Sequence, residues 1–181
     1  MLLQRKRLRK CTKKYDLMYH NFYSWYSSMK KNYILIPLIA IVVAVGGSML
    51  TNMGMVRYAT LNLHPLTPPG SLIGMVWTFI FICTALSALS FWKSFPRGKA
   101  FNRITWLFIA NAILNVLRSW IFFVNHWAVL ALVEMIVLRL VTLALFILLM
   151  RKNKISAWLL LPYLIWVILA SFFAYQVVIL N

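Results

Sequence analysis

Five long apolar stretches dominate this sequence and constrain its fold more than any other feature. They lie near residues 34–56, 71–92, 101–124, 127–150 and 155–180. Each is long enough to cross a hydrocarbon core of roughly 30 Å at about 1.5 Å per residue. Because the backbone in lipid must satisfy its hydrogen bonds internally, runs of this length predict helices. The sequence therefore predicts an all-α membrane protein, a bundle of five transmembrane helices.

The composition excludes an ordinary soluble domain. Hydrophobic residues make up 63% of the chain and charged residues 12%, whereas about a quarter of a typical soluble domain is charged. The net charge of +17 would suit a nucleic-acid partner. The apolar stretches leave no soluble surface for a nucleic-acid groove, so we expect no such partner. The cations are expected at the anionic face of a lipid bilayer instead.

The distribution of these cations predicts two regions and an orientation. Residues 1–33 form a basic, aromatic-rich tail with nine Lys and Arg, which we expect to contact anionic lipid at the cytoplasmic interface. Residues 34–181 form the transmembrane domain. The second and fourth connections add four and three cations, which makes sixteen with the tail, whereas the opposite side has Arg57. This asymmetry predicts a multi-pass protein of the cell membrane with a cytoplasmic N-terminus and an extracytoplasmic C-terminus.

Residue types that commonly carry chemistry are sparse. Cys11 lies in the tail and Cys83 in an apolar stretch, so we expect no disulfide between them. The three histidines are scattered, and no metal-ligand spacing occurs in the sequence. We therefore expect no metal site and no resident cofactor. The sequence also offers no nucleophile–base pair, which does not favour an enzyme.

The segment 66–78 couples a rigid loop to the start of the second apolar stretch. Its two prolines suit the first positions of a helix, where an N–H would be unpaired anyway. Gly70 and Gly74 lie on one helical face and predict a close contact with another helix. Trp77 lies one turn beyond Gly74 and could form the wall of a site for a flat apolar ligand. A second stripe that predicts helix packing consists of Ala40, Ala44, Gly47 and Thr51.

Three charges inside the predicted spans, Arg118, Glu134 and Arg139, are candidates for function, because charged groups in a bilayer are costly. Arg139 lies about 140° around the helix from Glu134, so we expect it to pack elsewhere or to extend toward the membrane surface. Arg118 lies eight residues before the turn near His126, and Glu134 eight residues after it. Both should reach a depth of roughly 10 Å. An Arg118–Glu134 ion pair is the first hypothesis, since either group alone would be uncompensated. Such a pair could also serve only to join helices, and Arg118 could instead bind a carboxylate of a ligand.

Four motifs in order resemble the TspO/MBR family, the tryptophan-rich sensory proteins related to the mitochondrial translocator protein. The motifs are Thr-Pro-Pro-Gly with Gly-Met-Val-Trp-Thr in 67–78, Leu-Asn at 114–115 with Ile-Phe-Phe at 121–123, Leu-Val-Glu at 132–134, and the segment 157–166. The resemblance covers roughly 33–181. It implies a five-helix bundle, often a homodimer, whose pocket binds porphyrins and, in some members, sterols or synthetic ligands.

The chain departs from the family pattern at several positions. Leu66 stands where the family usually has Trp, Arg57 replaces another Trp, and Ala174 replaces Asn. Arg118 also occupies a position that is normally Trp. No basic residue follows Tyr175, so we do not expect sterol binding.

The resemblance and the residues together predict a function. We expect the protein to bind a flat hydrophobic ligand, a tetrapyrrole first of all, under the first extracytoplasmic loop, for sensing, sequestration or transport. Two alternatives stay open: a tetrapyrrole-degrading enzyme that uses Trp77 and Trp166, and a proton-coupled transporter that uses Glu134. The expected ligand-binding residues are Tyr58, Pro68, Trp77, Asn115, Arg118, Phe122, Glu134 and Trp166.

Overall fold

The computed structural model describes residues 33–58, 60–62 and 64–180. The chain divides into two units, Met1–Leu35 and Ile36–Asn181. In the first unit only residues 33–35 are described, and they are helical and exposed. The predicted basic tail, with Cys11 and its expected lipid contacts, lies outside the described residues except for Tyr33. All contacts reported below lie within the second unit.

Five helices in the described part of the chain are long and apolar enough to cross a membrane, and no strand occurs there. This confirms the predicted fold class, and every predicted span agrees with a helix to within two residues at each end. The helices are the first helix (Tyr33–Tyr58), α2 (Gly70–Ser94), α3 (Lys99–Ser119) with its π-helical extension η1 (Trp120–Val124), α4 (Ala128–Met150) and α5 (Lys154–Leu180).

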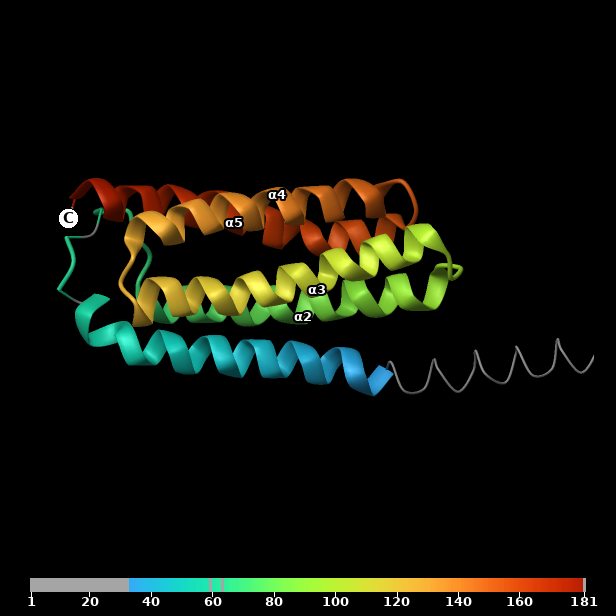
Figure 1. Cartoon of the computed structure of the whole chain (residues 1–181), viewed down its shortest axis with the longest axis horizontal. Coiled ribbons are helices and arrows are strands. Elements are labelled where there is room, and N and C mark those ends of the chain that lie inside the picture. Colours follow the sequence, from blue (N-terminus) through green and yellow to red (C-terminus); the bar gives the residue numbers. More distant parts are fainter. Residues whose placement is uncertain (1–32, 59, 63, 181) are drawn as a thin grey trace, which may run out of the picture. The chain divides into compact units, whose positions relative to one another are not determined.

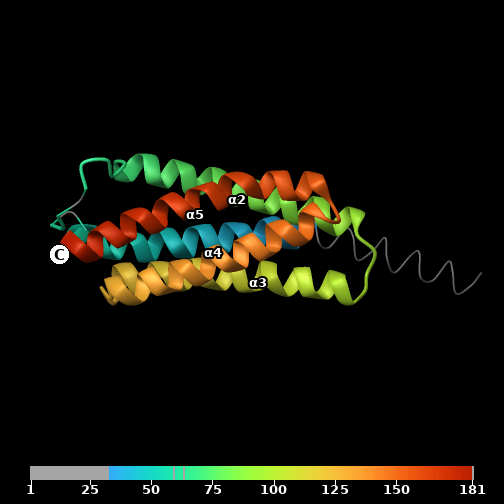
Figure 2. The same cartoon turned by 90° about the horizontal axis from the view of Figure 1, so that it is seen from above.

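The helices alternate in direction. The α2–α3 and α4–α5 connections lie at one end of the bundle, and the η1–α4 connection and the C-terminal end of α5 lie at the other (Figure 1). Helix α5 packs between α2 and α4, and α4 packs against α3 (Figure 2). The first helix lies along α3, with Gly47 close to Ser119. The connection between the first helix and α2 therefore lies at the same end as the η1–α4 turn.

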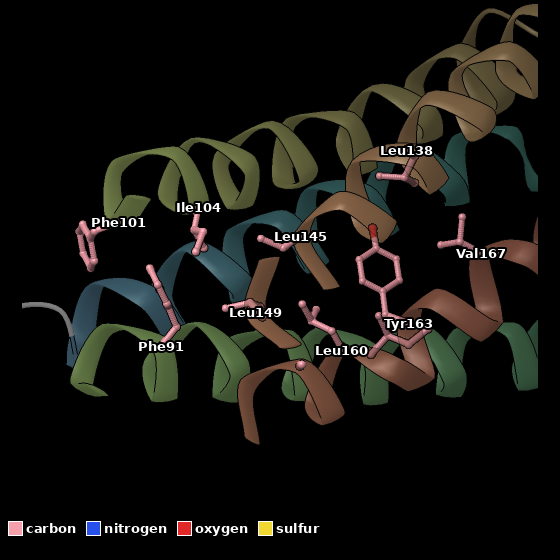
Figure 3. Packing of buried hydrophobic residues seen from close by; sticks show 11 residues of the cluster. Phe91, Phe101, Ile104, Leu138, Leu145, Leu149, Leu160, Tyr163 and Val167 are labelled. Carbon is pink, nitrogen blue, oxygen red and sulfur yellow. The ribbon is translucent and has the colours of Figure 1, made fainter. Parts of the chain in front are cut away.

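The densest core lies toward the α2–α3 and α4–α5 connections (Figure 3). The rings of Phe91 and Phe101 stack there with centroids 5.1 Å apart and an interplanar angle of 18°. Leu149 and Leu160 are fully buried. The cluster continues past the ring of Tyr163 to Leu138 and Val167 (Figure 3).

The outer surface of the bundle is apolar. Trp106, Ile113 and Val129 have more than half of their side-chain surface exposed, at 69%, 60% and 63%. In water such a surface would be unfavourable, but in a bilayer these side chains face acyl chains that are as apolar as they are. The protein is therefore a multi-pass membrane protein that contacts the lipid bilayer over most of its helical surface.

Gly54 allows a close approach between the first helix and η1. It is buried, and a Cβ added there would clash with the carbonyl oxygen of Phe123 and lie 2.7 Å from the Phe123 Cβ. These atoms belong largely to the backbone of η1 and cannot move aside independently. The absent side chain thus lets the first helix rest on η1. A Cβ on Gly46, in the same helix, would meet nothing within 4 Å.

Replacing Gly54 with Ala should force the first helix away from η1. Overpacking of this kind costs about 1–3 kcal/mol, and each kcal/mol lowers the melting temperature by roughly 2–4 °C for a chain of this size. Heating the protein in detergent and measuring the remaining monodisperse fraction by size-exclusion chromatography checks this. Gly46→Ala is the matched control and should leave the melting temperature unchanged or raised. Equal behaviour of the two variants would contradict the close contact.

Candidate ligand-binding cavity

A cavity of about 320 Å³ lies at the end of the bundle that carries the first connection. All five helices contribute to its lining. Its volume falls at the lower end of the range of about 300–1,000 Å³ that is common for small-molecule sites.

The cavity exists because small residues face it. Ala44 and Gly47 of the first helix line it, as do Gly70 and Gly74 of α2. A Cβ on Gly74 would meet nothing within 4 Å, and one on Gly70 would lie 3.4 Å from the side chain of Met55. The predicted close helix contact at Gly70 and Gly74 is therefore wrong. The missing side chains enlarge the cavity instead of bringing two backbones together.

Aromatic rings form two walls of the cavity. Trp77 of α2 lies 5.8 Å from Phe81 and 6.1 Å from Tyr163 between ring centroids, and the Tyr163 ring meets it edge-on. Trp166 of α5 also lines the cavity, and its buried Nε1 has no hydrogen-bond partner. The indole N–H of Trp166 is therefore a donor without an acceptor in the described part of the chain.

The π-helical segment η1 supplies further rings. The N–H of Asn125 donates to the carbonyl of Trp120 over five residues, which is the π-helical bond. Within η1, Phe122 and Phe123 line the cavity and lie 6.2 and 5.9 Å from Tyr58 between ring centroids. The chain then turns at His126, which has a positive φ of 60°. The predicted hairpin near His126 is thus confirmed.

Arg118 contacts Trp77 in the cavity wall. Its Cζ lies 4.6 Å from the centroid of the Trp77 ring, a cation–π contact. Its Nη2 donates one long hydrogen bond of 3.5 Å to Ser119 Oγ, and its buried Nε has no partner. Most of the hydrogen-bonding capacity of this guanidinium is therefore unused.

Glu134 lies outside the cavity lining, and its charge interacts with that of Arg118 through space, without the direct contact of the predicted ion pair. Both side chains belong to the described residues, yet neither carboxylate oxygen of Glu134, a residue only 6% exposed, has a hydrogen-bond partner. Ala131 and Met135 are the α4 residues that face the cavity. Glu134 is rotated from these by about 60° and 100° around the helix axis. The predicted depth brings the two charges close enough to interact, but the rotation of α4 leaves the carboxylate without a hydrogen bond to the guanidinium.

A buried amide cluster supports the floor of the cavity. Asn115 Nδ2 donates to the Tyr163 hydroxyl and to the carbonyl of Asn111, and Asn111 Nδ2 donates to Thr142 Oγ1 at 2.9 Å. These bonds join α3 to α4 and α5. The buried Oδ1 of Asn115 accepts no hydrogen bond, and Asn115 lines the cavity.

The first connection covers one side of the cavity. Thr67 lines it, whereas the half-buried Pro68 does not. Helix α2 starts at Gly70 with Pro69 at its N-cap, which confirms the predicted helix start. The His64 ring meets the Phe172 ring edge-on at 6.0 Å between centroids, so the connection rests on α5.

The cavity brings together six of the eight predicted site residues. Pro68 and Glu134 are the two that do not line it. Whether the six bind a ligand stays a prediction. They are Tyr58, Trp77, Asn115, Arg118, Phe122 and Trp166.

Sequence reasoning missed further lining residues, including Phe81 and Phe173. Helical spacing could have found both. Phe81 lies four residues after Trp77, and Phe173 seven after Trp166, so each shares a helical face with its tryptophan.

A second hollow of about 700 Å³ adjoins the cavity on the side of the η1–α4 turn. It shares Tyr58, Phe122 and Phe123 with the cavity lining. These three rings therefore form the partition between the two hollows. Arg57 and Trp127 line the second hollow and not the first.

Fold and cavity together define a helical multi-pass membrane protein with an internal, aromatic-walled site. Residues 33–180 match the TspO/MBR family, and the chain belongs to that family. The chain is similar to the tryptophan-rich protein TspO of Bacillus cereus, with 30% identity over 154 residues that cover 84% of this chain and 99% of that protein. It is 29% identical over 150 residues to the TspO of Archaeoglobus fulgidus, covering 81% and 96% of the two chains. It is 25% identical over 124 residues to the uncharacterised membrane protein YtaB of Bacillus subtilis, covering 68% and 79%.

Glu134→Gln tests whether the buried carboxylate makes an ion pair. Removing one partner of a buried ion pair costs about 3–5 kcal/mol, whereas an amide replaces an unpaired carboxylate without such a loss. We expect the melting temperature in detergent to stay constant or rise. A fall of several degrees would show that the carboxylate stabilises the bundle through a charge contact. Asn115→Leu is the control. It removes the hydrogen bonds that Asn115 donates within α3 and to α5, and it should lower the melting temperature.

Proposed function

We propose that this membrane protein binds a flat hydrophobic ligand, a tetrapyrrole such as a porphyrin, in the cavity beneath the first connection. Binding would serve sensing, sequestration or transport of that ligand. The observation that carries the proposal is the internal cavity of about 320 Å³ with Trp77 and Trp166 in its walls. Membership of a family whose curated relatives are named tryptophan-rich proteins supports it.

The chemistry of the walls suits such a ligand. Indole and phenyl rings offer flat apolar area and offset or edge-on contacts to an aromatic macrocycle. A small number of polar groups then fixes its orientation, as in most small-molecule sites. Trp166 Nε1 and Asn115 Oδ1 are a donor and an acceptor without partners in this lining.

The second hollow bears on the size of the ligand. A porphyrin is larger than a compact ligand that would just fill the cavity of about 320 Å³. Rotation of the Tyr58 and Phe122 rings would join the cavity to the adjoining hollow of about 700 Å³. We propose that a macrocycle bound in the cavity extends past these rings.

We further propose that the protein lies in the cell membrane with its N-terminus in the cytoplasm. The α2–α3 and α4–α5 connections, which lie at one end of the bundle (Figure 1), hold seven basic residues at or near them, whereas Arg57 lies near the end of the first helix that leads to the opposite end. By the positive-inside rule the basic end faces the cytoplasm, which places the cavity in the outer half of the membrane. A homodimer, and anionic lipid at the basic tail, stay predictions from the sequence. The basic residues are Lys93, Arg97, Lys99, Arg103, Arg151, Lys152 and Lys154.

Filling the cavity should abolish binding without unfolding the protein. Gly74→Leu places a side chain into space that is empty within 4 Å of the Cβ position. Protoporphyrin affinity, measured by quenching of tryptophan fluorescence, should fall by about 10-fold or more, which corresponds to about 1.4 kcal/mol.

Gly46→Leu is the matched control for this experiment. It adds the same side chain to a helix at a glycine with open surroundings that does not line the cavity, and it should bind as the wild type does. Equal affinity of both variants would show that porphyrin binds elsewhere. Absorption spectra recorded in light and in the dark distinguish plain binding from pigment degradation by Trp77 and Trp166, which requires a new product.

A further inference from the structure

Arg118 is a half-buried cation that no carboxylate contacts directly in the described part of the chain; Glu134 attracts it only through space. It touches the face of Trp77 and the hydroxyl of Ser119, both uncharged groups. Glu134, which the sequence suggested as its partner, makes no hydrogen bond through either carboxylate oxygen and does not line the cavity. A charged guanidinium that has no hydrogen-bonded anion raises the free energy of the protein inside a membrane.

The contacts of Arg118 leave it ready to bind an anion. A cation–π contact uses the positive charge and not the N–H donors. Nε is buried without a partner, and Nη2 makes a single bond at 3.5 Å. A carboxylate can accept two parallel N–H bonds from a guanidinium, a geometry that gives both strength and orientation.

We propose that Arg118 selects ligands that carry a carboxylate next to a flat aromatic body. This inference rests on the proposed function and narrows its ligand class. The aromatic body lies against the rings of Trp77 and Trp166, and the carboxylate reaches Arg118 beside Trp77. Neutral ligands of the same shape bind more weakly, because they leave the guanidinium without a hydrogen-bonded anion.

The test uses two probes with one ring system, protoporphyrin IX and its dimethyl ester. Affinities of the two are measured by tryptophan quenching for the wild type, Arg118→Met and Arg118→Lys. The wild type should prefer the diacid to the ester by about 10- to 100-fold, the range expected for a hydrogen bond to a charged group. Arg118→Met should lose this preference, so that it binds the diacid and the ester with similar affinity, and measurable ester binding shows an intact cavity. Arg118→Lys should recover part of the preference.

The ratio of the two affinities is compared between variants, so different partition of the probes into detergent cancels. An unchanged ratio in Arg118→Met would overturn the inference and leave the proposed function standing. If Arg118→Met also loses ester binding, its melting temperature shows whether the variant misfolds or the cavity changes shape. The ratio of the two affinities in Arg118→Lys then decides. A preference for the diacid that is reduced but present supports the inference, and no preference in a folded variant that binds the ester overturns it.

A smaller pair of probes separates this inference from the choice of tetrapyrrole. Pyrenebutyrate and pyrenebutanol share a flat aromatic body and differ in the carboxylate. If neither porphyrin binds but the wild type prefers pyrenebutyrate in an Arg118-dependent way, the carboxylate inference holds and the tetrapyrrole proposal fails. Absence of binding by both pairs would overturn both.

Discussion

The distribution of small and large side chains along the helices decides where this bundle is solid and where it is hollow. Toward the basic end, Phe91, Phe101 and the leucines of α4 and α5 fill the interior. Toward the first connection, Gly47 and Gly74 are among the small residues that line the cavity. Membrane helices gain little from excluding water between them, so packing contacts determine their arrangement. The Gly54–η1 contact holds the first helix close enough to enclose the cavity.

Polar groups in the cavity wall turn this hollow into a site with chemical preferences. The amide of Asn115 is anchored to Tyr163 and Asn111, which fixes one edge. Arg118 rests on Trp77, so in the binding mode that we propose a ring and a cation act as one recognition element. Because water is scarce at this depth, an anion that reaches the guanidinium would meet little screening. In small-molecule sites of this kind, buried apolar area contributes most of the affinity, and a few polar atoms determine which ligand binds.

Much of the fold could be predicted from the sequence because a bilayer dictates the length of its helices. Hydrophobic length located each span, and the turn at His126 and the helix start after Pro69 were both predicted. The depth of each side chain in the membrane could also be predicted, since it follows from the rise per residue of a helix. The rotation of α4 about its axis could not, because it depends on packing against neighbouring helices, and this is why Glu134 was misplaced.

Contacts between residues distant in sequence could not be predicted either, because they too depend on how the helices pack together. Gly54 is an isolated glycine until Phe123 lies against it. Gly70 and Gly74 have the spacing of a close helix contact, but no helix backbone approaches them; Gly70 meets only the side chain of Met55, and Gly74 has nothing within 4 Å. The π-helical turn of η1, which brings Phe122 and Phe123 to the cavity, has no recognised sequence signal. Small residues in a helix are compatible both with a close neighbouring helix and with an empty volume beside them. Only the structure shows which of the two is present.

The location of a bound ligand tests this account most directly. A crystal structure of the protein loaded with cobalt protoporphyrin would locate the metal by its anomalous scattering. We predict a single strong peak inside the cavity between Trp77 and Trp166, with a propionate of the ligand in contact with Arg118. A peak on the lipid-facing surface, with the cavity empty and Arg118 still resting on Trp77 alone, would contradict the account.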